Sequence, residues 1–167
     1  LESLEVPVLA FLRTLGHGCS DIRELAATLT PPDFPAQYQS EPWNSNTTLP
    51  LPADSCPDHI VEWTGLLKQA METSGVRLTG IRARILFPGE FNSQVAKTNS
   101  KGSVLASATL TLVRELCDQF PTGNTTVFCD KHGGRNRYDE VISDHFDDQF
   151  VFRIEESRER SRYRMGT

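Results

Sequence analysis

The 167-residue sequence has no apolar run near the ~20 residues of a bilayer-spanning helix, so it predicts no membrane segment. Its first residues, LESLEVPVLAFL, carry two glutamates and no basic start, so they predict no signal peptide. Its four cysteines form no Cys-x-x-Cys pair, which disfavours a zinc site and favours free thiols in a reducing compartment. These absences together predict a cytoplasmic protein without a membrane partner.

Basic residues are scarce in the first part of the chain. Residues 1–60 hold eight acidic residues against two arginines, whereas residues 131–167 hold eight residues of each sign. With a net charge of -5, the chain as a whole is not expected to coat nucleic acid. The distribution instead favours a local basic surface near the C-terminus.

Hydrophobic periodicity predicts the order of the elements. Helical spacing of apolar residues covers residues 1–15, 22–29, 57–74, 101–120 and 138–146. Period-two alternation or a short apolar run predicts strands over residues 76–87, 125–130 and 149–155. Two further segments are interpreted as connections, the proline-rich residues 30–57 and the polar residues 88–100.

From residue 58 onward, predicted helices and strands alternate, which is typical of an α/β fold with parallel or mixed strands joined by right-handed crossovers. The length suits one core, so we expect residues 1–167 to form a single α/β domain with residues 30–57 as a long connection. The chain begins inside an apolar helical pattern and ends at RYRMGT after a charged segment. We therefore expect a fragment of a longer protein, incomplete at both ends.

A carboxylate followed by a basic loop stands out in VFCDKHGGRNRY, residues 127–138. Asp130 follows a predicted strand, and ligands of open α/β sheets bind beyond the carboxyl ends of strands, although an aspartate there also caps turns. Arg135 and Arg137 can grip phosphates, or can pair with neighbouring acidic residues. His132 can serve as a general base or metal ligand, although a lone loop histidine is more often neither, and the Gly-Gly pair permits either a close ligand or a positive φ.

A second set of charged residues lies in RIEESRERSRYR, residues 153–164. Its arginines recur at every second position, so a strand would place them on one face that can follow phosphates. Glu155 and Glu156 follow an apolar strand, and carboxylates at two strand ends can build a Mg²⁺ site. The alternative is a solvated run of charges that pair with one another. The alternating arginines are Arg158, Arg160, Arg162 and Arg164.

The stretch KTNSKG, residues 97–102, is a third candidate. It places Lys101 at the expected N-terminus of a helix, where exposed backbone N–H groups favour anions. Lys101 is therefore expected to help hold a phosphodiester backbone.

The run IRARILFPGEFN, the helix after it and TTVFCDKHGG resemble the middle of the type 2 ribonuclease H family. GEFN, KTNSKG, CDKHGGRNRY and EESRERSRYR resemble more closely a group of uncharacterised bacterial proteins that look like distant members of that superfamily. The resemblance covers about residues 76–164. It implies a ribonuclease H-like mixed sheet flanked by helices, with Asp130 as the metal-binding aspartate. The family's opening Asp-Glu-Ala-Gly strand is absent, so the chain is expected to lack the first strand and two acidic ligands.

On this resemblance we expect the parent protein to be a Mg²⁺- or Mn²⁺-dependent nuclease acting on RNA or an RNA/DNA hybrid. Asp130 would hold the metal, Glu155 or Glu156 would be a second ligand, and the arginines with Lys101 would bind phosphates. The rival expectation is a non-catalytic nucleic-acid-binding module of the same fold, which needs only a continuous basic face. A small-molecule phosphate binder with a backbone nest at the Gly-Gly pair is a third alternative. The sequence indicates no particular protein partner.

Overall fold

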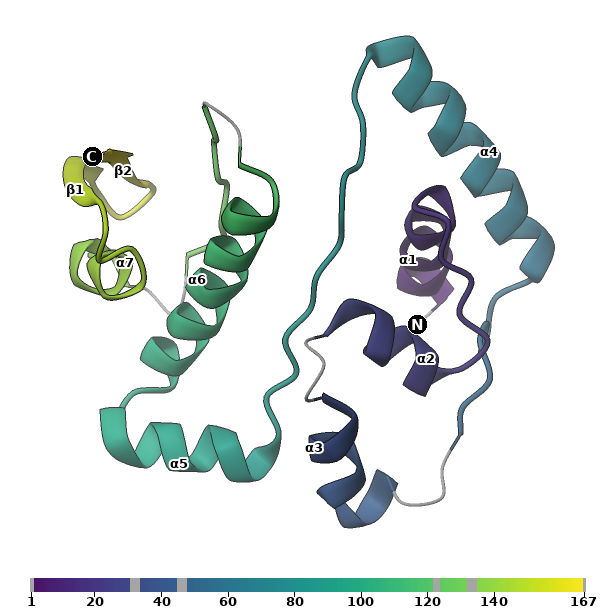
Figure 1. Cartoon of the computed structure of the whole chain (residues 1–167), viewed down its shortest axis with the longest axis horizontal. Helices are drawn as coiled ribbons and strands as arrows, with labels where there is room; N and C mark the ends of the chain where they lie inside the picture. Colours follow the sequence, from purple (N-terminus) through teal and green to yellow (C-terminus); the bar gives the residue numbers. More distant parts are fainter. Residues whose placement is uncertain (1, 31–33, 45–47, 122–123, 132–134, 167) are drawn as a thin grey trace. The chain divides into compact units, whose positions relative to one another are not determined.

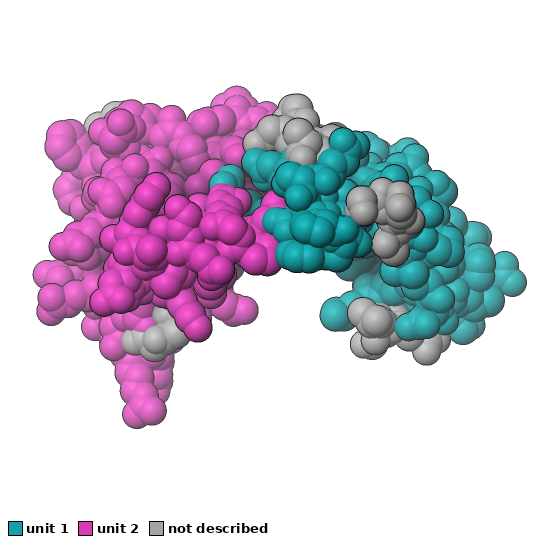
Figure 2. All heavy atoms as spheres, turned by 90° about the horizontal axis from the view of Figure 1, so that it is seen from below, with its two compact units in different colours: residues 1–85 teal, residues 86–167 magenta. Residues whose placement is uncertain are grey.

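The computed structural model describes residues 2–30, 34–44, 48–121, 124–131 and 135–166. The chain divides into two compact units, residues 1–85 and residues 86–167, which are coloured separately in Figure 2 and drawn as ribbons in Figure 1. The described part is mixed helix and strand. None of its helices combines the length and the apolar character that crossing a membrane requires.

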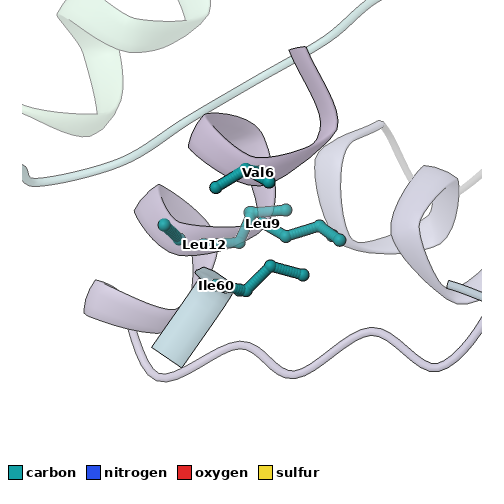
Figure 3. Packing of buried hydrophobic residues seen from close by; sticks show 5 residues of the cluster. Val6, Leu9, Leu12 and Ile60 are labelled. Atoms are coloured by element: carbon teal, nitrogen blue, oxygen red, sulfur yellow. The ribbon is translucent and has the colours of Figure 1, made fainter. Parts of the chain in front are cut away.

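The first unit is helical, and its core forms between α1 (Glu2–Thr14) and α4 (Pro57–Ser74). Figure 3 shows Val6, Leu9 and Leu12, which recur every three residues along α1, packed with Ile60 of α4. Leu12 and Ile60 are almost fully buried. Burying a side chain of this size contributes about 1.5–3 kcal/mol, so this contact is the main apolar link between the two helices.

A carboxylate of α1 holds the chain that leads into α4. Glu5 accepts hydrogen bonds from the backbone N–H groups of Ala53, Asp54 (3.0 Å) and Ser55 (2.8 Å). Burial by itself would raise the pKa of Glu5, but these hydrogen bonds favour the charged form and lower the pKa to about 2. The segment before α4 is therefore anchored to α1 by a charged acceptor.

The proline-rich connection contains more regular structure than its sequence predicts. After α2 (Ile22–Leu29), which Asp21 caps through the N–H groups of Arg23 and Glu24, the chain forms α3 (Phe34–Ser40) and the 3-10 helix η1 (Pro42–Asn44). The expectation of an irregular segment over residues 30–57 is wrong for these stretches. Pro35, Pro42 and Pro57 lie at or near the starts of helical turns, where a missing N–H costs little.

The strand predicted over residues 76–87 is absent, because this segment has no strand neighbour in the described structure. It runs as an extended connection from α4 to the second unit. Ala83 donates its backbone N–H to the carbonyl of Leu29 (2.8 Å), and Ile81 packs against the first unit's core. Alternation of apolar residues predicts an extended chain, but a strand also needs a neighbour to complete its hydrogen bonds.

In the second unit, the expected polar connection over residues 88–100 is instead the helix α5 (Pro88–Thr98). Pro88 occupies the first helical position, where its fixed φ suits the helix. Asn99 ends the helix with a positive φ of 49° and donates its N–H to the carbonyl of Val95 (2.7 Å). These local signals were present in the sequence and outweigh its polar composition.

α6 (Lys101–Gln119) and α7 (Asp139–His145) pack together around the buried Phe146. The guanidinium of Arg114 lies 5.4 Å from the Phe146 ring centre and forms an ion pair with Asp148 (2.5 Å). His145 joins the helices as well. Its Nδ1 donates to the backbone carbonyl of Val141 (2.8 Å), which can only accept, and its Nε2 is hydrogen-bonded to the Ser107 hydroxyl (3.0 Å).

The sheet of the second unit consists of β1 (Phe150–Glu156) and β2 (Ser161–Gly166), paired antiparallel. The strand predicted over residues 149–155 is confirmed as β1, but residues 125–130 form no strand and are exposed, with Phe128 92% exposed. The expected sheet of parallel or mixed strands is therefore not realised in the described residues, whose sheet has two strands. Parallel pairing depends on long-range contacts that alternation cannot predict.

Candidate functional site

The two strands form the arginine hairpin, residues 150–166, in which facing residues share one side of the ribbon. Phe152 lies opposite Arg164, and Glu155 lies opposite Arg162. Arg162 and Arg164 alternate along β2 and lie on the side that Phe152 occupies, and an irregularity between Arg153 and Glu155 shifts the register by one residue, which brings Glu155 to the same side. By this register, the outer face carries Phe150, Phe152, Glu155, Arg162 and Arg164, and the inner face carries Val151, Arg153, Glu156, Tyr163 and Met165.

The two faces differ in exposure. Phe150 is 72% exposed and Phe152 is 55% exposed, and both outer arginines are exposed. On the inner face, Val151, Tyr163 and Met165 are half-buried, and β1 contacts α7. The hairpin is therefore supported from the inner side and open on the outer side.

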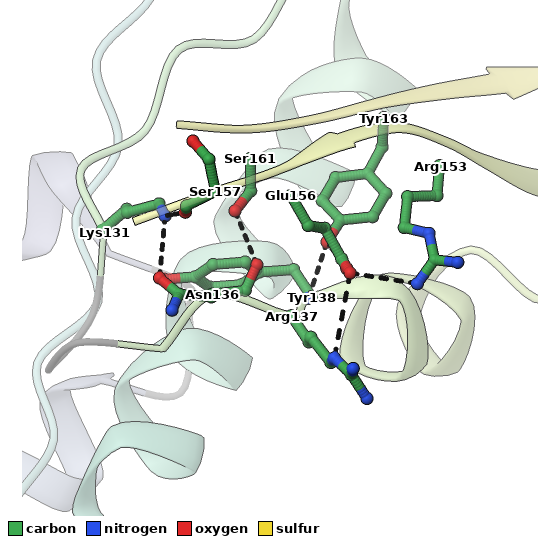
Figure 4. A network of polar contacts seen from close by, with 9 residues as sticks. All are labelled: Lys131, Asn136, Arg137, Tyr138, Arg153, Glu156, Ser157, Ser161 and Tyr163. Carbon is green, nitrogen blue, oxygen red and sulfur yellow. Dashed lines mark hydrogen bonds and ion pairs between the residues drawn. The ribbon is translucent and has the colours of Figure 1, made fainter. Parts of the chain in front are cut away.

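Glu156 is the centre of the polar network on the inner side (Figure 4), and its side chain is only 10% exposed. It accepts a hydrogen bond from the Tyr163 hydroxyl, contacts Arg153 at 3.1 Å and lies 3.9 Å from Arg137. The Tyr163 oxygen in turn accepts from the backbone N–H of Tyr138 (2.9 Å). Burial first, and then the hydrogen bond to Glu156, raise the pKa of Tyr163 to about 12, so the hydroxyl stays protonated at neutral pH.

The basic segment after Asp130 braces the turn of the hairpin. The Lys131 ammonium donates to the backbone carbonyls of Ser157 (2.5 Å) and Arg158 (3.3 Å) and to the Asn136 side chain (3.1 Å). The Ser161 hydroxyl donates to the Asn136 carbonyl (2.6 Å), as Figure 4 shows. The turn therefore has a cation and a second chain segment holding its backbone, which fixes the hairpin against the rest of the second unit.

The predicted site arginines divide into paired and unpaired groups. Arg160 donates twice to Glu155, at 2.7 and 3.0 Å, and the 81% exposed Arg137 lies at the edge of the Glu156 network. Within the described residues, no carboxylate pairs with Arg158, Arg162 or Arg164, and all three are exposed. The alternation predicted that the arginines lie on one face of a strand. This is confirmed for Arg162 and Arg164, whereas Arg158 and Arg160 lie in the turn before β2.

Lys101 and Arg135 lie at the start of α6. Lys101 is exposed and is the first residue of the helix, which Ser100 caps through the N–H of Ser103 (3.2 Å). Arg135 donates to the Ser103 hydroxyl (2.6 Å) and is half-buried. Neither residue joins the network around Glu156, so the described contacts do not unite all predicted phosphate ligands in one place.

The described residues do not fit a divalent cation. They contain no group of three or more metal-ligating side chains. Asp130 is exposed, Glu155 is paired with Arg160, and Glu156 is occupied by a tyrosine and arginines. His132 and the Gly-Gly pair at residues 133–134 lie outside the described residues. The Mg²⁺ or Mn²⁺ ligand set therefore stays a prediction.

Three features of the site were missed from the sequence. Tyr163 and Lys131 hold the hairpin together, and Phe150 and Phe152 occupy its open face. The alternation of aromatic and charged residues in β1 and β2 was visible in the sequence. The sequence did not indicate which face of the hairpin would be covered by the rest of the second unit. That choice is made by the contact between β1 and α7.

No family model matches this chain, and neither a curated protein nor a solved structure is significantly similar to it. The candidate site therefore stands on its own geometry.

Proposed function

We propose that this chain is a nucleic-acid-binding module that holds phosphates with the arginine hairpin. The observation that carries the proposal is a set of exposed arginines on a braced two-stranded ribbon, Arg158, Arg162 and Arg164, which have no carboxylate partner among the described residues. Residues 150–166 hold five arginines against three glutamates. Two of the glutamates are already paired, so most of the positive charge on the open side is available to an anionic partner.

The hairpin also has the rigidity that such contacts need. Each arginine that is held in place by a fixed backbone loses less conformational freedom when it binds a phosphate. Lys131, Asn136 and Tyr163 fix both the turn and the inner face. Two-stranded ribbons are among the elements that proteins present to nucleic acids.

Fluorescence anisotropy with a labelled RNA 12-mer tests this proposal. The double variant Arg162→Gln/Arg164→Gln should bind more weakly, and the slope of log affinity against log salt should fall by about 1.5, because each lost phosphate contact removes roughly 0.7–0.9. Arg77→Gln is the matched control, since Arg77 is exposed but lies in the first unit. An unchanged affinity and salt slope in the double variant would refute phosphate binding by the hairpin.

We propose second that this protein has a ribonuclease H-like fold and is a metal-dependent cytoplasmic nuclease, as the family resemblance implies. Residues 76–87 and 125–130 support this, because both have strand-like sequences and are extended without a strand partner in the described structure. All four cysteines are free thiols, which suits a reducing compartment. Calorimetric titration of Mn²⁺ into the chain, and into Asp130→Asn, tests the metal site, since binding that persists in the variant would exclude Asp130.

A further inference from the structure

The outer face of the arginine hairpin combines its cations with exposed aromatic rings. Phe152 lies directly opposite Arg164, and Phe150 lies on the same face two residues earlier. Both rings are more than half exposed, at 55% and 72%. Exposed phenylalanines beside exposed arginines suit a ligand that offers both flat apolar groups and negative charge.

The space beside Phe150 is open. Its cross-strand neighbour is Gly166, which has no side chain to lie against the ring. A Cβ atom built on Gly166 would meet nothing within 4 Å. A flat group can therefore reach the ring of Phe150 from the side of β2 without displacing another side chain.

The spacing of the two rings matches an unstacked strand of nucleic acid. Alternate residues of a strand lie about 6.6–6.8 Å apart, so two bases that are splayed out along the ribbon can each meet one phenylalanine. In a duplex the faces of the bases are already stacked on each other, so a duplex cannot use these rings. Arginines on the same face lie where a phosphate backbone would pass.

We infer that the ligand of this hairpin is a single-stranded nucleic acid, with bases stacked on Phe150 and Phe152 and phosphates held by Arg162 and Arg164. The inference rests on the proposed nucleic-acid-binding function and narrows its substrate class. It differs from the RNA/DNA hybrid that the family resemblance implies, because a hybrid duplex offers phosphates but no free base faces.

The test compares a labelled oligouridine 12-mer with an RNA/DNA hybrid duplex of the same length, using the full 167-residue chain. The variant Phe150→Leu/Phe152→Leu keeps apolar side chains but removes the aromatic faces. It should bind the single strand at least about 10-fold more weakly, by the usual size of base stacking, with an unchanged salt slope and unchanged duplex binding. Phe152→Tyr should keep most of the affinity, because a tyrosine ring still stacks.

Phe128→Leu is the matched control, since Phe128 is 92% exposed and lies outside the hairpin. Full single-strand affinity in the leucine double variant would overturn stacking, and so would a wild-type preference for the hybrid duplex. In both cases the proposed function would still hold if Arg162→Gln/Arg164→Gln weakens binding. Failure of the wild-type chain to bind either ligand would overturn both proposals.

Discussion

Replacing Tyr163 by phenylalanine should loosen the arginine hairpin. The substitution keeps the ring and removes a hydroxyl that donates to Glu156 and accepts from the backbone N–H of Tyr138. Both partners are at least half-buried, so water does not fully replace the lost contacts. Leaving a buried polar group without its partner costs about 1–3 kcal/mol. Glu156 still has Arg153 beside it, which reduces its share of the loss.

The expected total is about 2 kcal/mol of local stability, which corresponds to roughly 30-fold faster amide exchange where the hairpin opens without global unfolding. Hydrogen exchange followed by mass spectrometry measures this directly on residues 150–166. Amides of α1 in the first unit serve as the internal control, because the hydrogen bonds of Tyr163 are made to Tyr138 and Glu156 of the second unit. Unchanged exchange in the hairpin of Tyr163→Phe would show that the Glu156 network does not stabilise it.

Absorbance titration of the tyrosinates gives an independent check on the same side chain. The pKa of Tyr163 is raised from 10.0 to about 12, so its contribution to stability is fully present below pH 10. That contribution is lost as pH rises from 10 through 12. The tyrosine that ionises near pH 12 in the wild-type chain should be missing in Tyr163→Phe. A wild-type chain in which every tyrosine ionises near pH 10 would contradict the arrangement around Glu156.

Two further predictions concern the first unit and the backbone. Because the pKa of Glu5 is lowered, its contribution to the free energy of unfolding is present above pH 4.5 and is lost as the pH falls toward 2. After allowance for screening by water, Glu5→Gln should lower the free energy of unfolding by about 1–2 kcal/mol at pH 7. At pH 2 the substitution should have almost no effect. Urea unfolding followed by tryptophan fluorescence measures this, because both tryptophans belong to the first unit. Gly75 ends α4 with a φ of 68°, so Gly75→Ala should lower the unfolding free energy by about 1 kcal/mol, whereas Gly89→Ala in α5 should raise it. Equal effects of the two alanines in thermal melts would refute the backbone explanation.

The helices α2, α4 and α6 begin where the sequence predicts, because their signals are local. Asp21 and Ser100 cap their helices with side-chain oxygens, and Pro57 occupies the first position of α4. The signals for α5 are equally local, but the polar composition of residues 88–100 led to the prediction of a connection. Helix positions were therefore determined by the sequence over stretches of a few turns.

The strands and the site depended on contacts between distant segments. Alternation was equally clear in residues 76–87 and 149–155, yet only the second became a strand, because β2 lies beside it and, in the part of the chain that the structure describes, no strand lies beside the first. The sequence likewise offered Glu156 as a metal ligand. The fold instead buries it against Tyr163 and Arg153, a choice that depends on which side of the hairpin meets α7.

The sequence by itself determined α1, α2, α4, α6 and α7, the concentration of arginine near residue 160 and the alternation that puts Arg162 and Arg164 on one side of a ribbon. Tertiary structure alone decided which arginines find a carboxylate and which aromatic rings stay open. The physical reason is the distance along the chain over which each interaction acts. Helix capping and hydrophobic periodicity act within a few residues, whereas strand pairing, burial and charge neutralisation require segments that folding brings together.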